Sequence, residues 1–139
     1  MEKSFLIFKP DCMLAQHLGP VLERLTRPGF KCVAIKMARL DEATLKTHYA
    51  HVADKPFFPE IVEFMTESPV VMAVLEGDNV VQAVRDLLGP TDSKAAPKGT
   101  LRGDLGTDKM RNILHASDSP DAALKEIELF FKKEELFAY

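Results

Sequence analysis

Short apolar runs alternate with amphipathic helical segments along this chain, and this alternation limits the fold more than any other feature. The runs over residues 4–8, 31–39 and 70–75 are too short for helices and predict strands. Apolar residues recur at helical spacing over residues 14–25, 61–65, 80–88 and 123–131. With residues 112–115 as a last short strand, the predicted order is β-α-β-(α-α)-β-α-β-α, and 139 residues leave room for one domain, over residues 1–139.

Local signals set the ends of these elements. Pro10 follows the first strand, so we expect the strand to end there in a loop. Asp41 is a favourable N-cap for a helix that reaches about His51, and Phe57 opens the next helix. Ser119 and Pro120 form an N-cap and first-turn pair for the last helix.

Charge and cysteine usage exclude several classes of protein. A formal charge of −3 is too acidic for a protein that binds nucleic acid without sequence preference. Cys12 and Cys32 lack CxxC spacing, so we expect two reduced thiols and a cytoplasmic location. The first nine residues contain only four consecutive apolar positions, too few for a signal peptide or a membrane span, and no membrane anchor is expected.

One long segment has no clear periodicity. Residues 89–111 predict a loop of 23 residues, and structureless stretches of that length in small domains are more often functional than idle. This segment contains five Lys and Arg and three Asp, which gives it a charge of +2 in a chain that is negative overall. Because the chain is acidic overall, any anion site must be local, and this segment is the one that stands out in charge.

The four histidines differ in what their positions indicate. The sequence contains neither G-x-x-x-x-G-K-[ST] nor G-x-G-x-x-G, so the usual glycine cradles for nucleotide phosphates are excluded. His115 lies at the end of an apolar run before a polar turn, where it is either a nucleophile and proton carrier or an exposed turn histidine. His48 and His51 share a helical face, but without a third ligand we favour a solvated face over a metal site. His17 is a weaker candidate.

Six short motifs, in order and at matched spacing, give the chain a family resemblance. Nearly end to end, the sequence resembles the nucleoside diphosphate kinases. The motifs are Lys9-Pro10-Asp11, Lys55-Pro56-Phe57-Phe58 after Tyr49, Ser68-Pro69-Val70-Val71, Leu88-Gly89-Pro90-Thr91, Gly99-Thr-Leu-Arg-Gly-Asp104 and Asn112-Ile113-Leu114-His115 followed by Ala-Ser-Asp.

The resemblance implies a fold and a reaction. The implied fold is α+β: a ferredoxin-like, four-stranded antiparallel sheet with packed helices and a helical hairpin insertion. The implied reaction moves the γ-phosphate of a nucleoside triphosphate, typically ATP, to a nucleoside diphosphate through a phosphohistidine, by a ping-pong mechanism. Mg²⁺ is implied as a cofactor on the nucleotide phosphates, with no metal site of the protein's own.

The resemblance also implies roles for ten residues. His115 is the implied nucleophile, Glu126 orients it, and Ser117 supports Glu126. Phe57 is expected to stack on the base. Phosphate contacts are implied for Lys9, Tyr49, Arg85, Thr91 and Arg102, and ribose contacts for Lys9 and Asn112. Cationic groups spread over several elements suit a triphosphate, because negative charge develops on the transferring oxygens.

Some positions depart from the usual pattern of the family. Cys12 and Ala116 stand where glycine is common, and Ala15-Gln16 replaces Arg-Gly. Residues 93–98 also differ from the family pattern. These last two changes affect subunit contacts rather than reactive groups, so they leave the oligomeric state open. The resemblance implies a homo-oligomer, either a tetramer or a hexamer built from dimers. The alternative reading is a non-catalytic ferredoxin-like regulator that binds nucleotide or nucleic acid.

Overall fold

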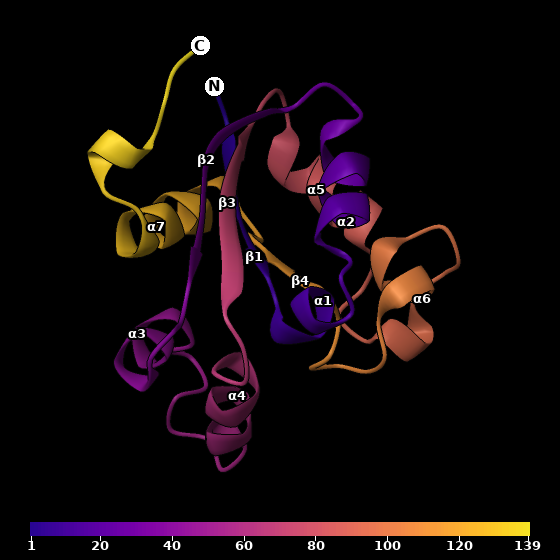
Figure 1. Ribbon diagram of the computed structural model, residues 1–139, viewed down its shortest axis with the longest axis vertical. Helices are drawn as coiled ribbons and strands as arrows, with labels where there is room; N and C mark the ends of the chain where they lie inside the picture. Colours follow the sequence, from indigo (N-terminus) through magenta and orange to yellow (C-terminus); the bar gives the residue numbers. More distant parts are fainter.

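The four strands form one antiparallel sheet in the order β2-β3-β1-β4 in a computed structural model that describes residues 1–139. The strands are β1 (Lys3–Phe8), β2 (Lys31–Ala38), β3 (Val70–Glu76) and β4 (Leu114–Ala116). β1 lies between β3 and β4, with Phe5 opposite Val74 and Ile7 opposite His115 (Figure 1). The ferredoxin-like fold is confirmed, and every predicted strand and helix is present in the predicted order, with two short helices, at Pro10–Leu14 and Leu101–Leu105, in addition.

Seven helices surround the sheet. Their bounds are α1 (Pro10–Leu14), α2 (Leu18–Thr26), α3 (Glu42–His48), α4 (Phe58–Met65), α5 (Val80–Leu88), α6 (Leu101–Leu105) and α7 (Pro120–Phe130), with short 3₁₀ turns at Ser93–Ala95 and Lys133–Glu135. The predicted caps are confirmed: Asp41 accepts from the backbone of Thr44, and Ser119 accepts from that of Ala122. No helix of the chain is long and apolar enough to cross a bilayer.

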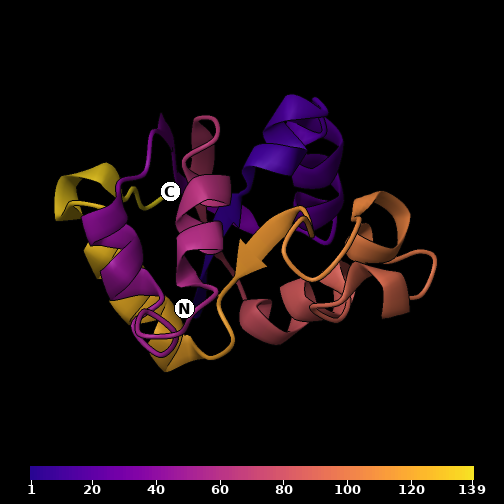
Figure 2. The ribbon, with the colours of Figure 1, turned by 90° about the horizontal axis from the view of Figure 1, so that it is seen from below.

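Both faces of the sheet are buried, which explains why β1 is apolar from Phe5 onward and β3 is apolar up to Leu75. Phe5 and Ile7 point into a core beneath α3, α4 and α7, whereas Leu6 and Phe8 point into a second core with α2 and α5. Figure 2 shows α3 and α7 on one side of the sheet and α2 and α5 on the other.

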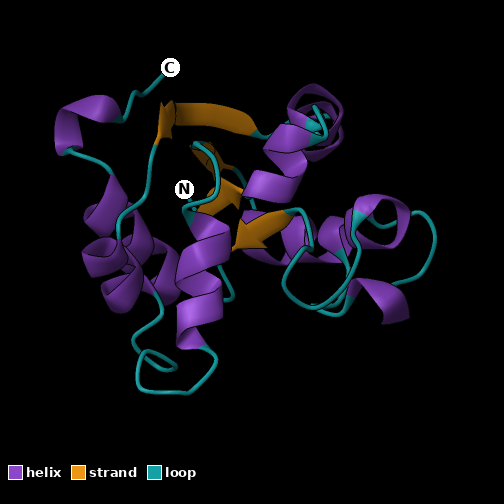
Figure 3. Ribbon diagram, turned by 60° about the horizontal axis from the view of Figure 1, so that its bottom comes forward, coloured by secondary structure: helices purple, strands orange, loops and turns teal.

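The structure differs from the sequence expectation at two loops. Helix α1 begins at Pro10, directly after β1, because proline at the first helical position lacks only an N–H that would be unpaired there. Residues 89–111 are not structureless: they hold the 3₁₀ turn and α6, and Thr100 caps α6 by accepting from the backbone of Gly103 (Figure 3). Helices of three to five residues are too short to show a period in sequence.

Candidate active site

Strand pairing and a strained turn place His115. Alternation along β4 buries Leu114 and Ala116 in the core on the α2 and α5 face, so the His115 side chain points to the opposite face. Just before β4, Ile113 adopts φ 79°, unusual for a β-branched residue, and the Leu114 amide donates to the Asn112 carbonyl at 2.9 Å. The Ile113 amide donates to Asp11 Oδ2 at 2.9 Å, which holds this turn in place.

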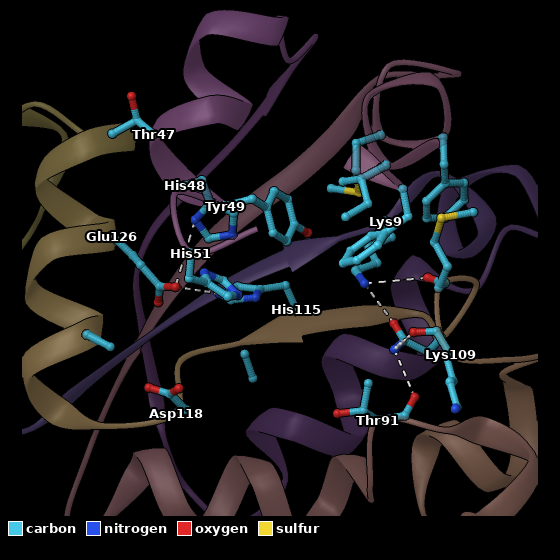
Figure 4. A pocket seen from close by; sticks show the side chains of 18 of the residues that line it. Lys9, Thr47, His48, Tyr49, His51, Thr91, Lys109, His115, Asp118 and Glu126 are labelled. Carbon is cyan, nitrogen blue, oxygen red and sulfur yellow. Dashed lines mark hydrogen bonds and ion pairs between the residues drawn. The ribbon is translucent and has the colours of Figure 1, made fainter. Parts of the chain in front are cut away.

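A carboxylate fixes the His115 ring. Nε2 of His115 lies 2.8 Å from Oε2 of Glu126 on α7 (Figure 4). The hydroxyl of Ser117 donates to Oε1 of Glu126 at 2.6 Å. Burial raises the pKa of Glu126, but the hydrogen bonds from His115 and Ser117 outweigh it and the pKa lies below its usual value. An ionised carboxylate therefore accepts the Nε2 proton and leaves a lone pair on Nδ1 of His115.

His48 lies against the same pair of residues. Its side chain is 2% exposed, its Nδ1 is 3.8 Å from Glu126 Oε2, and its ring centroid is 4.6 Å from that of His115. Burial, with a contribution from His115, lowers the pKa of His48 to about 3, so the ring is neutral. The expectation of a solvated face is wrong for His48, because α7 and β4 cover the C-terminal end of α3; His51 is exposed as expected.

Lys9 and Asn112 join the end of β1 to the segment before β4. Lys9 Nζ donates to Asn112 Oδ1 at 2.8 Å, and the Asn112 amide group donates to the carbonyls of Thr91 and Lys109. Burial, and then the positive charge of Arg102, lower the pKa of Lys9 to about 8. Without a bound anion, the charged form of Lys9 is therefore less stable in this site than in water. A bound anion would stabilise it.

Arg102 is a buried clamp. Its Nε donates to the carbonyl of Asn112 at 3.1 Å, Nη1 to that of Gly89 at 3.2 Å and Nη2 to that of Leu114 at 2.8 Å. Burial, and then the charge of Arg85, lower the pKa of Arg102 to about 10. The guanidinium thus fastens the 89–111 segment to the start of β4 while it lines the pocket, whereas Arg85 is exposed on α5.

A single cavity of about 1050 Å³ joins these groups. Nine of the ten residues named from sequence line it, and Ser117 is fully buried behind Glu126. Five Lys and Arg line the cavity against three Asp and Glu, so the lining is positive in a chain of net charge −3. The nine are Lys9, Tyr49, Phe57, Arg85, Thr91, Arg102, Asn112, His115 and Glu126. The cavity can take a large polyanionic ligand with an imidazole at its wall.

Sequence reasoning missed two residues of this region, His48 and Asp11. Asp11 supports the strained turn before β4, and its place in the Lys9-Pro10-Asp11 motif was the available signal. The role of His48 depends on residues 115–126, which are far from it in sequence, so no local pattern could reveal it.

Comparison with known proteins adds independent findings. The family model described as "Nucleoside diphosphate kinase" matches residues 2–136. Proteins of that name from Methanobrevibacter smithii and Macrococcus caseolyticus are 44% and 46% identical, over 100% of this chain and 93% and 94% of theirs. A Halobacterium salinarum nucleoside diphosphate kinase solved in complex with CDP aligns with TM-score 0.96 at 41% identity, covering 99% of this chain and 92% of that one. The Aquifex aeolicus enzyme aligns with TM-score 0.91 at 43% identity, covering 98% and 99%.

Proposed function

The chain belongs to the nucleoside diphosphate kinase family, a family of phosphotransferases, and we propose that within it His115 carries the phosphoryl group between nucleotides. One observation carries this assignment. The Glu126 carboxylate holds Nε2 of His115 at 2.8 Å in the wall of a positively lined cavity, which leaves Nδ1 free to attack.

In the proposed first half-reaction, the Nδ1 lone pair attacks the γ-phosphorus of a nucleoside triphosphate. A nitrogen–phosphorus bond forms, the bond from the γ-phosphorus to the bridging oxygen breaks, and the nucleoside diphosphate leaves with that electron pair. The ring gains positive charge in this step, and the ionised Glu126 stabilises it through the Nε2 proton. A second nucleoside diphosphate then takes the phosphoryl group by the reverse chemistry.

Cations and donors around the cavity suit the phosphates. Lys9 and the exposed Arg85 can approach phosphate oxygens directly, and Arg102 adds its charge and the two of its five N–H groups that the three carbonyls leave free. Mg²⁺ is proposed to enter on the nucleotide phosphates, since Glu126 is already held by His115 and Ser117. We propose that Tyr49 and Thr91 also contact the phosphates and that Asn112 contacts the ribose, as the resemblance implies.

Phe57 supplies the proposed contact to the base. It lies at the start of α4, lines the cavity and is 48% exposed, unusual for so large an apolar side chain. A stacked base would cover it, and stacking tolerates any base because every base has a π-face.

Initial-rate kinetics test the proposed mechanism. Because a covalent phosphoenzyme lets the first product leave before the second substrate binds, reciprocal plots at several fixed concentrations of the second nucleotide should be parallel. Plots that intersect would indicate direct transfer between two bound nucleotides and would overturn the role given to His115.

Glu126→Ala is expected to bind nucleotide normally and to form phosphoenzyme ~10–100-fold more slowly, by analogy with the loss of a carboxylate that orients a metal-bound histidine. Glu126→Gln should lose less, since an amide oxygen still accepts the Nε2 proton. The measurement is rapid quenching with γ-labelled ATP. Glu128→Ala, an exposed position on the same helix, is the control and should match wild type. Equal rates for Glu126→Ala and wild type would show that the carboxylate does not assist transfer.

The lowered pKa of Lys9 predicts a loss of kcat/KM on the alkaline side. The ammonium is charged below a pKa of about 8 and loses its proton as pH rises through that value, and kcat/KM reports the free enzyme. Lys9→Met should show a lower kcat/KM and no alkaline fall near that pH. A wild-type profile that stays flat from about pH 7 to about pH 9 would show that the charge on Lys9 is not required.

We further propose a homo-oligomer in the cytoplasm, of one domain per chain. β2 is an edge strand, and it carries Ile35 and Met37 at 50% and 61% exposure, which favours association through that edge.

The alternative of a sheet that binds nucleic acid is disfavoured, because helices pack on both faces of the sheet and leave no open face for bases.

A further inference from the structure

Three side chains at the end of the cavity form a compact set of metal-ligand atoms. His48, His115 and Glu126 each offer one atom, and these atoms lie within 4.8 Å of one another. The closer separations are 2.8 Å between His115 Nε2 and Glu126 Oε2, and 3.8 Å between His48 Nδ1 and the same oxygen. The three residues come from α3, β4 and α7, and Figure 4 shows both rings turned toward Glu126.

His48 Nδ1 is the unusual member of this set. It is fully buried, has no hydrogen-bond partner, and belongs to a side chain that is 2% exposed. Burying a polar nitrogen without a partner is unfavourable by about 1–3 kcal/mol, and no step of the proposed phosphoryl transfer uses it. In the tautomer with the ring proton on Nε2, the Nδ1 lone pair of His48 can bind a cation that lies between Nδ1 and Glu126 Oε2.

We propose that His48, His115 and Glu126 form an inhibitory binding site for a divalent transition-metal cation of the Zn²⁺ class. Bonds of about 2.0–2.2 Å to two imidazole nitrogens and a carboxylate oxygen give the three-ligand set typical of zinc sites that keep an open position. The His115 to Glu126 and His48 to Glu126 separations bracket the spacing of ligands around a tetrahedral ion, so small side-chain shifts suffice. All three residues line the cavity, from which a fourth ligand would come.

The surroundings of the set favour such an ion. Ser117 donates to Oε1 of Glu126 and fixes the carboxylate, as outer hydrogen bonds do in known metal sites, and the metal would replace the His115 proton at Oε2. The Phe5 and Phe130 rings pack against His48 and limit its movement. Imidazole ligands select Zn²⁺ and similar ions over Mg²⁺, which prefers oxygen, so the site is distinct from the cation carried by the nucleotide.

A metal ion bound at this site would stop His115 from acting as a nucleophile, because it would change which ring nitrogen carries the proton. A neutral imidazole has one N–H and one lone pair, and in the proposed mechanism the proton is on Nε2 of His115 and the lone pair on Nδ1. A metal bound to Nε2 takes the lone pair at that nitrogen, and the ring proton moves to Nδ1. Nδ1 then cannot attack phosphorus. This consequence rests on the proposed function, whereas metal binding itself does not.

Titration of the metal-free full-length protein with Co²⁺ or Zn²⁺, without nucleotide, tests the site. We expect one equivalent of Co²⁺ to give the intense visible absorption of a four-coordinate ion, and Zn²⁺ to displace it. His48→Phe, which preserves an aromatic ring in an aromatic setting, should weaken binding by ~100-fold or more, the upper end of the loss caused by removing an outer-shell partner. Glu126→Ala should do the same if His48→Phe does not fold. His17→Ala is the control for loose binding to a surface histidine and should bind as wild type does.

The site is refuted if wild type shows no four-coordinate cobalt spectrum, or if folded His48→Phe or Glu126→Ala binds as tightly as wild type. Phosphoenzyme formation from γ-labelled ATP at buffered free Zn²⁺ tests the inhibition separately: label should fall with Zn²⁺ in wild type and fall much less in His48→Phe. If no label forms even without Zn²⁺, the proposed function fails, while the cobalt result still decides whether the metal site exists.

Discussion

His115→Ala is expected to abolish phosphoenzyme formation and to lower nucleotide exchange by on the order of 10⁶-fold, the loss seen when another enzyme is deprived of its nucleophile. Nucleotide binding should persist, because the cationic lining of the cavity is untouched. None of the other three histidines matches it: His48 Nδ1 is buried facing Glu126, and His17 lies at the start of α2, outside the cavity. His51 lines the cavity, but no carboxylate holds its ring as Glu126 holds that of His115.

The measurement pairs exchange assays with a direct binding titration of a nucleoside diphosphate. His17→Ala provides the matched control and should retain wild-type exchange. Substantial exchange by His115→Ala at normal binding would place the nucleophile on another residue.

Arg102→Met is expected to lower the free energy of unfolding by ~3 kcal/mol or more, because each hydrogen bond from a charged donor contributes about 1.5–3 kcal/mol. The substitution removes three hydrogen bonds from a charged donor and leaves the carbonyls of Gly89, Asn112 and Leu114 without that partner. These carbonyls flank the segment that carries His115, so activity should fall together with stability.

Urea unfolding monitored by circular dichroism measures this effect, and Arg85→Met is its matched control. Arg85 was given the same phosphate role from sequence, but it is exposed and has no hydrogen bond within the protein, so its stability should change by about 0.5 kcal/mol or less. Equal stability for the two variants would mean that the clamp by Arg102 does not hold the fold.

The contrast between these arginines shows what sequence could and could not predict. The family resemblance assigned both to one site, and both line the cavity. It could not show that one is a buried clamp on backbone carbonyls, because those carbonyls come from three separate positions brought together by folding.

The same distinction applies to secondary structure. Strands β1 and β3 and helices α5 and α7 have strong local patterns and lie where the sequence predicted them. Helix α6 was missed because five residues with a central glycine, Gly103, carry no readable period, and tertiary contacts hold the helix instead. His48 was misjudged for a related reason: its burial comes from α7, which follows it by some seventy residues.

Mapping of transferred phosphate tests the central claim most directly. The protein is incubated with γ-labelled ATP and Mg²⁺, freed of nucleotide, and digested under alkaline conditions for peptide sequencing and phosphorus NMR. We predict one acid-labile, alkali-stable label on Nδ1 of His115, discharged completely by any nucleoside diphosphate. A label on another residue, on Nε2 of His115, or one that nucleoside diphosphates do not remove would contradict the account.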